Sequence, residues 1–121
     1  MKTILIMMQN DDLRLPLADW ISLEGFDVVQ TNDAIAGLRI AEVLPVEIIF
    51  CDLEMLEMDS FKEKLRCYSE AHRENQTSHI IAISDSKSIV QALALGADDF
   101  LFSGAQLYEF LQLAMMKLRQ A

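Results

Sequence analysis

Acidic and hydroxyl residues follow directly after two of the short apolar runs in this 121-residue sequence. Asp52 and Glu54 come after one run, and Ser84 and Asp85 come after the next. Carboxylate oxygens are ligands that Mg2+ prefers, and an Asp carboxylate can also act as a nucleophile. A single Asp that leaves a buried strand is nevertheless more often a cap or a turn former. The chemistry of Asp52 therefore depends on which residues the fold brings beside it.

The apolar runs themselves predict five β-strands. Most of their residues are β-branched or aromatic, and they lack polar alternation, which is typical of parallel strands buried on both faces. The runs are Ile4–Met7, Val28–Val29, Ile48–Cys51, Ile80–Ile83 and Phe100–Phe102.

Between these runs the hydrophobic period changes to about 3.6 residues, which predicts helices. In the first helix, Pro16 is close to the start, so we expect regular helix only from about Leu15. Asp12 is the expected cap of this helix. Trp20 shares a face with Leu17 and is expected to point inward.

Four further helices follow from the same pattern. The expected N-caps are Asn32 or Asp33 for the second helix, Asp59 or Ser60 for the third, and Ser86 or Ser88 for the fourth. The third helix would direct Phe61, Leu65 and Tyr68 inward, and the fourth would run around Ile89, Val90 and Leu93. The last helix has the clearest apolar face, made by Leu107, Phe110, Leu111, Ala114, Met115 and Leu118.

Strands that alternate with helices predict an α/β fold in which a parallel sheet is covered on both faces. We find no linker, repeat or low-complexity segment, so residues 1–121 are expected to form one domain. In an open parallel sheet, function sits at the carboxyl ends of the strands. The chain has only 4 glycines, and they form no phosphate-cradling loop, which disfavours a flavin or nucleotide site.

The composition narrows the expected partners. The chain has 10 Lys and Arg against 19 Asp and Glu, a formal net charge of -9. An acidic surface repels phosphates, so neither nucleic acid nor an anionic membrane is an expected partner. The run that ends at Met8 is too short for a signal peptide, and no stretch reaches the roughly 18 apolar residues of a membrane span. With two cysteines in no metal-binding spacing, we expect a cytoplasmic protein.

Three segments and the order of the elements resemble the receiver domain of two-component response regulators. The segments are FCDLEMLEMDSF, IIAISDS and ALGADDFLFSG, and Leu95–Phe100 is especially characteristic. The likeness covers essentially the whole chain. It implies a flavodoxin-like, doubly wound sheet of five parallel strands in the order 2-1-3-4-5, and a role in signal transduction or a phosphorelay.

The resemblance also implies a site. In receivers the Asp that ends the third strand accepts a phosphoryl group, and that position is Asp52. A Ser or Thr that ends the fourth strand binds the phosphoryl oxygens, which corresponds to Ser84. An aromatic residue on the fifth strand moves with the switch, which corresponds to Phe100. Asp52 is thus the candidate phosphoacceptor, and Ser84 and Phe100 are the candidate switch residues.

Five positions depart from the receiver pattern. Met8 and Gln9 stand where the family has an acidic pair that holds Mg2+, and Ser103 stands where it has a Lys. Leu56 and Gly104 replace two characteristic prolines. A thioether is a poor Mg2+ ligand, and phosphoryl transfer depends on positioning and charge neutralisation. We therefore expect no cofactor and poor phosphorylation of Asp52.

Two functions remain open. The first is an atypical receiver, or pseudo-receiver, that binds signalling proteins such as a histidine kinase, an output domain or another regulator. By analogy it would use the face formed by the fourth helix, fifth strand and fifth helix, and it would not be an enzyme beyond weak autophosphorylation. The alternative is a phosphoaccepting receiver that binds Mg2+ with Glu54 or Asp85 in place of the missing acids. A weaker third possibility is that Met8 fills the pocket and holds one conformation permanently.

Overall fold

The structure is a computed structural model that describes residues 2–57, 67, 78–85 and 96–121. The third and fourth predicted helices, and the part of the expected binding face that the fourth would supply, lie outside these residues. No helix in the described part of the chain is long and apolar enough to cross a membrane.

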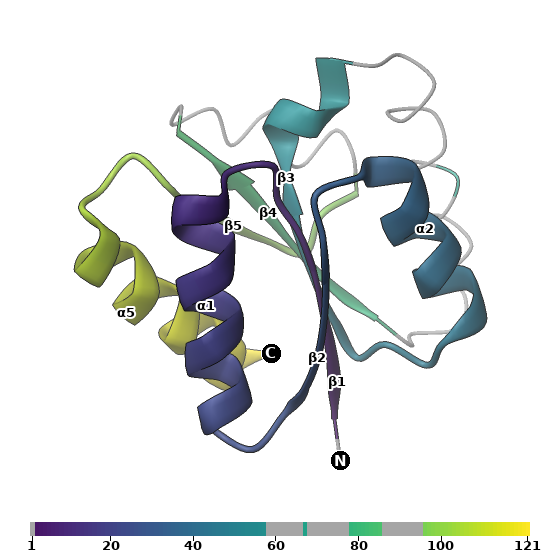
Figure 1. Ribbon diagram of the computed structural model, residues 1–121, viewed down its shortest axis with the longest axis horizontal. Coiled ribbons are helices and arrows are strands. Elements are labelled where there is room, and N and C mark those ends of the chain that lie inside the picture. Colours follow the sequence, from purple (N-terminus) through teal and green to yellow (C-terminus); the bar gives the residue numbers. More distant parts are fainter. Residues whose placement is uncertain (1, 58–66, 68–77, 86–95) are drawn as a thin grey trace.

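The described residues form a five-stranded parallel sheet in the order β2-β1-β3-β4-β5 (Figure 1). This confirms the predicted strands and the implied flavodoxin-like order. Each strand extends its apolar run by one or more residues, and every residue of β3 is buried. The strands are β1 (Thr3–Met7), β2 (Asp27–Thr31), β3 (Ile48–Asp52), β4 (His79–Ser84) and β5 (Asp99–Phe102).

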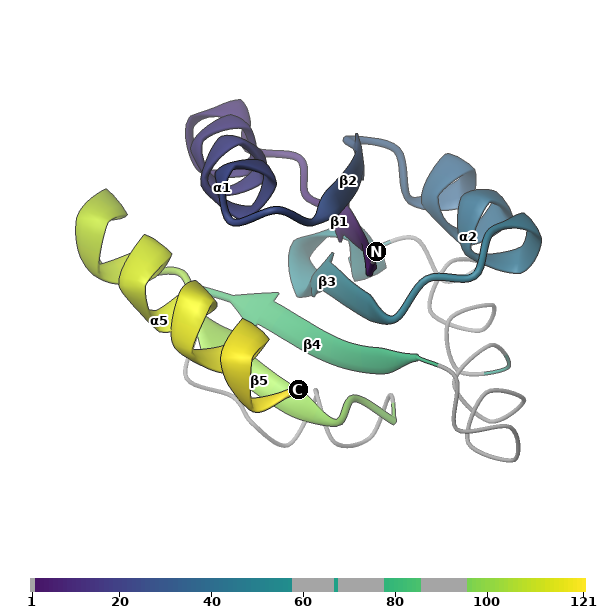
Figure 2. The ribbon, with the colours of Figure 1, turned by 90° about the horizontal axis from the view of Figure 1, so that it is seen from below.

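Helices lie on both sides of the sheet (Figure 2). The helices α1 (Asp11–Leu23) and α5 (Leu107–Gln120) share one face, and α2 (Ala34–Val43) covers the other. Alternate residues of each strand enter the two core clusters, as the period of two in a strand requires. For example, Ile4 and Ile6 pack on the side of α1 and α5, whereas Leu5 and Met7 pack on the side of α2.

The start of α1 differs from our expectation in two respects. The helix begins at Asp11, and Asn10 is its cap, since the Asn10 Oδ1 accepts the Asp12 N–H at 2.9 Å. Pro16 lies inside the helix, so the predicted start near Leu15 and the predicted Asp12 cap are wrong. The missing N–H of Pro16 leaves only the carbonyl of Asp12 without its helical partner, and Asp12 is exposed to solvent. The cap upstream therefore outweighs the proline.

The other two described helices follow the predicted patterns closely. Asp33 caps α2 by accepting the Ile35 N–H at 3.3 Å. The predicted face of α5 is buried from Phe110 to Leu118, but Leu107 at its start is 42% exposed and so lies largely outside the core. Trp20 is only half-buried, and its ring stacks on Tyr108 with centroids 6.4 Å apart, which joins α1 to α5.

Candidate functional site

Asp52 is the last residue of β3 and lies at the carboxyl edge of the sheet. Only 5% of its surface is exposed. On one side it pairs with Ile83 of β4. On the other side, Met7 pairs with Cys51, so the next residue on each strand brings Met8 beside Asp52. The candidate phosphoacceptor therefore has an apolar residue on each side, Ile83 on β4 and Met8 just beyond the end of β1.

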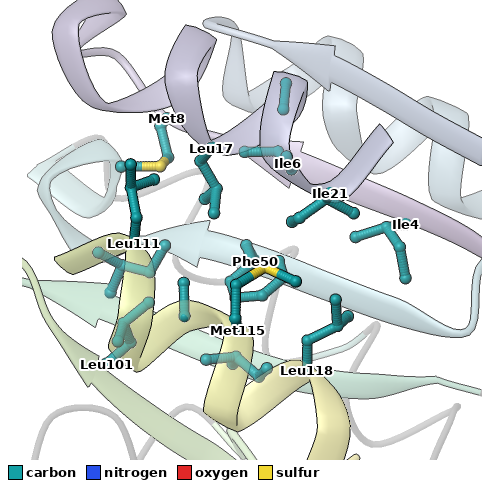
Figure 3. Close-up of a cluster of buried hydrophobic side chains, with 14 of the residues drawn as sticks. Ile4, Ile6, Met8, Leu17, Ile21, Phe50, Leu101, Leu111, Met115 and Leu118 are labelled. Atoms are coloured by element: carbon teal, nitrogen blue, oxygen red, sulfur yellow. The ribbon is translucent and has the colours of Figure 1, made fainter. Parts of the chain in front are cut away.

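Met8 belongs to the hydrophobic core. It is 1% exposed and lies in the cluster between the sheet, α1 and α5, with Leu17 and Leu111 (Figure 3). Its backbone N–H donates to the Thr31 carbonyl at 3.1 Å, which continues the strand pairing beyond Met7. The residue that occupies the place of a metal ligand in the resemblance is thus a packed core side chain.

Two backbone N–H groups bind the Asp52 carboxylate. The Glu54 N–H donates to Oδ1 at 3.0 Å, and the Gln9 N–H also bonds the carboxylate. Gln9 itself is exposed. These two bonds hold the β1–α1 and β3–η1 connections around Asp52, where η1 is the 3-10 turn Leu53–Glu57 that contains Leu56.

The pKa of Asp52 is raised above the ordinary value of an aspartate. Burial is the main cause, because it disfavours the charged form, and the charge of Asp85 raises the pKa further. The hydrogen bonds from Glu54 and Gln9 lower it without reversing the shift. Among the residues that the structure describes, no Lys or Arg pairs with Asp52. The described residues therefore supply no cation to this buried carboxylate.

The predicted lysine position does not supply that cation. Ser103 is half-buried, and its N–H donates to the Ser84 carbonyl at 2.8 Å. Lys117 of α5 is engaged elsewhere, with Nζ 2.9 Å from Asp99 Oδ1. Burial opposes ionisation of Asp99, but the hydrogen bond and charge of Lys117 are among the effects that leave its pKa lowered.

Of the two candidate switch residues, Ser84 lies at the same edge and Phe100 lies within β5. Ser84 is buried at the end of β4, one residue beyond the Ile83 that pairs with Asp52. Phe100 is partly buried and packs against the core on the side of α2. Gly104 adjoins the ring of Phe102, and a Cβ at this position would collide with the ring carbons. The ring of Phe102 therefore occupies the space that a side chain at position 104, such as that of proline, would need.

The described residues at this edge do not form a cluster of metal-binding side chains. Asp85 and Glu54 are exposed, and Asp85 is near enough for its charge to act on Asp52. Within the described part of the chain, no three His, Cys, Asp or Glu side chains gather as metal ligands would. The side chain of Met8 carries a thioether and no oxygen, and its backbone carbonyl accepts a hydrogen bond from Arg14.

Arg14 is a charged residue near this edge that our sequence reasoning missed. It is buried in α1, and its guanidinium contacts the Met8 carbonyl, Gln30 and Asp11. Its position carried a signal, since residue 14 precedes the buried Leu17 by three positions and so lies on the inner face of the helix. A charge at an apolar position of the period indicates a buried, paired group.

Comparison of the sequence with protein-family models gives no match, and comparison with curated proteins gives none either. Solved structures do match. The receiver domain protein from Methanospirillum hungatei is 22% identical, with a TM-score of 0.75 over 99% of this chain and 95% of the other. The chemotaxis protein CheY4 of Vibrio cholerae is 17% identical, with a TM-score of 0.80 over 99% and 98%.

A third structure contains a protein complex. It is the receiver domain of the Saccharomyces cerevisiae response regulator Ssk1, solved together with the histidine phosphotransfer protein Ypd1. It is 19% identical to this chain, with a TM-score of 0.76 over 97% of this chain and 85% of that one. Together with the strand order, these likenesses show that the chain has the CheY-like fold of response regulator receiver domains.

Proposed function

We propose that this chain is an atypical receiver module that acts in signal transduction by binding other proteins and does not depend on Mg2+-assisted phosphorylation of Asp52. The observation that carries the proposal is the side chain of Met8, which is buried in the core directly beside Asp52. A phosphoryl group on Asp52 would add negative charge beside an apolar neighbour, with no cation from the described residues to neutralise it.

The fold supports the interaction part of the proposal. Ssk1 was solved with a phosphotransfer protein, so a receiver with this fold can bind a protein partner. In this chain the expected face includes β5 and α5, and Leu107 and Met116 of α5 are exposed large side chains. Partners of the expected kinds are a histidine kinase, an output domain or another regulator.

A test of the proposal is chemical modification in solution. The protein is incubated with millimolar Mg2+ and acetyl phosphate, and its intact mass is followed over time. Asp52→Asn, which cannot accept the phosphoryl group, is the matched control. We expect the same mass for both proteins. A stoichiometric gain of one phosphoryl group that Asp52→Asn does not show would overturn the proposal.

The second candidate function is a phosphoaccepting receiver in which Glu54 or Asp85 compensates for the missing acids. The observation in its favour is that Asp52 is retained and that the charge of Asp85 already acts on it. This candidate requires Mg2+ binding that weakens in both Asp52→Asn and Glu54→Gln. Isothermal titration of the three proteins with Mg2+ separates it from the first.

A separate experiment tests whether Met8 holds the protein permanently in one conformation. The combined substitutions Met8→Asp, Gln9→Asp and Ser103→Lys would restore the acidic pair and the lysine of the receiver pattern. If a single fixed packing of Met8 is what prevents phosphorylation, this variant should gain mass with acetyl phosphate where the starting protein does not. No gain in a variant that circular dichroism shows to be folded would mean that other positions also oppose the reaction.

A further inference from the structure

The buried guanidinium of Arg14 bridges three parts of the structure. Its Nη1 donates to the Met8 carbonyl at 2.9 Å, and its Nε donates to Gln30 Oε1 at 3.1 Å. Its Nη2 lies 2.6 Å from Asp11 Oδ1. Met8 directly follows the first strand, Asp11 begins α1, and Gln30 belongs to β2. Both ends of the β1–α1 connection and the neighbouring strand therefore meet at one side chain.

Because Arg14 is buried, its contacts are needed to stabilise its charge. Arg14 is 8% exposed, and a charge taken out of water is tolerated only when it is paired and its donors are satisfied. The planar guanidinium presents its donors in a fixed fork, so its three nitrogens bind their partners in one relative arrangement. A shift of the β1–α1 connection would break at least one of these contacts to the buried Arg14 side chain.

The connection that Arg14 holds also reaches Asp52. The Met8 N–H donates to the Thr31 carbonyl, and the next N–H along the chain, that of Gln9, bonds the Asp52 carboxylate. With the Met8 carbonyl bound by Arg14, both backbone polar groups of Met8 have partners. Its side chain packs in the core.

We infer that Arg14 is an internal clasp that holds the β1–α1 connection (residues 8–10) in one arrangement, keeping Met8 buried beside Asp52 without a bound metal. This inference rests on the proposed function, since it explains how the connection stays ordered in a receiver that uses no Mg2+. Arg14 acts as a positioning residue through the backbone of Met8 and does not touch Asp52.

Amide hydrogen exchange followed by NMR, without Mg2+ or phosphodonor, tests the clasp. Arg14→Met keeps much of the aliphatic stem and removes the charge and all three contacts. The matched control is Arg39→Met, because Arg39 is an exposed arginine of α2. The informative amides are those of Met8 and Gln9, and the references are the core strand amides of Ile49 and Ile81.

We expect the Met8 and Gln9 amides to exchange at least about tenfold faster in Arg14→Met, beyond any change at the reference amides. In Arg39→Met the same amides should be unaffected. If all amides of Arg14→Met accelerate by one common factor, Arg14 contributes only global stability and the clasp is refuted. Unchanged exchange at Met8 and Gln9 refutes it equally.

Two milder variants cover the case in which Arg14→Met does not fold. Gln30→Met removes one of the three partners, and Arg14→Lys keeps the charge but lacks the fork. Both should accelerate Met8 and Gln9 selectively, by less than the full deletion, and a uniform or absent effect in both overturns the inference. Because these measurements use no phosphodonor, the clasp can fail while Asp52 stays unmodified, and the proposed function can fail while the clasp holds.

Discussion

Met8 and Asp52 lie side by side at the carboxyl ends of β1 and β3, one residue beyond the Met7–Cys51 pair. Met8 is a core residue, since it packs in the cluster that Ile6 and Phe50 also enter. Asp52 is a nearly buried carboxylate with a raised pKa. A receiver that accepts a phosphoryl group needs positive charge near its aspartate, whereas this pair offers a thioether. The position of Met8 beside Asp52 is therefore the reason why we expect poor phosphorylation of Asp52.

Met8→Asp should strongly destabilise the fold. The substitution removes a buried apolar side chain and places a second carboxylate beside Asp52, where the described residues supply no cation. We expect a loss of about 3–5 kcal/mol in the free energy of unfolding. Urea denaturation measures it, and Met116→Asp is the control, because Met116 lies on α5 with 53% of its surface exposed. Equal stability of the two variants would mean that Met8 does not pack as described.

Asp52 should make the protein less stable as the pH rises. Since burial raises its pKa in the folded state, folding favours the protonated form. The stabilising contribution is complete below the unfolded pKa of about 3.9 and is lost as the pH rises through the raised folded value. Asp52→Asn cannot ionise, so its stability relative to the starting protein should increase between about pH 4 and 7. Urea denaturation across this range checks the trend, and parallel pH curves would contradict it.

A companion variant isolates the effect of the neighbouring charge. Asp85→Asn removes the negative charge that raises the pKa of Asp52. The Asp52 side-chain carbon should then titrate at lower pH in NMR spectra than it does in the starting protein. An unchanged titration would show that Asp85 is too far away or too well solvated to act on Asp52.

Gly104 and Phe102 should be energetically coupled. A Cβ at residue 104 would collide with the far end of the Phe102 ring, so Gly104→Ala must displace the ring. We expect a cost of about 1–3 kcal/mol in the free energy of unfolding. The same substitution in a Phe102→Leu background should cost much less, because the shorter side chain leaves room. Equal costs in the two backgrounds would rule out this contact as the reason for glycine at position 104.

Lys117 should stabilise the end of α5 through Asp99. Lys117→Met breaks a pair at 2.9 Å in which both side chains are mostly buried, so we expect a loss of about 0.5–1 kcal/mol at neutral pH. Because the pKa of Asp99 is lowered, this contribution is present above the unfolded pKa and disappears as the pH falls through the folded value. Arg119→Met is the control, since its pair with Glu24 is longer, at 3.7 Å, and more exposed. A larger loss in Arg119→Met would contradict the assignment.

Much of the fold could be predicted from the sequence because its strands are buried on both faces. A continuous apolar run such as Ile48–Cys51 has few alternatives in a chain of alternating elements, and the structure buries every residue of that strand. The beginning of α1 could not be predicted in the same way. Asn10 and Asp12 are both good caps, and the choice between them depends on where the chain leaves β1. Pro16 pointed to the wrong start because its lost hydrogen bond falls at a solvent-exposed residue.

The site was only partly predictable. Asp52 and Ser84 end their strands at one edge of the sheet, as parallel topology requires, whereas Phe100 lies within β5. The roles of all three residues remain predictions. The environment of Asp52 was not predictable, because burial and pKa depend on contacts between distant segments. Sequence spacing also could not show that Arg14 would bind the carbonyl of Met8. Every residue has a backbone carbonyl, so the order of residue types does not indicate which carbonyl is bound.

The most direct test of the central claim is an NMR titration of the Gln9 and Glu54 amides, which bind the Asp52 carboxylate. Beryllofluoride, a stable mimic of the phosphoryl group, is added with millimolar Mg2+ to the labelled protein and to Asp52→Asn. The account predicts that neither amide shifts in a saturable way and that the two proteins behave alike. Saturable shifts of Gln9 and Glu54 that extend to Ser84 and Phe100, and that are absent in Asp52→Asn, would contradict it.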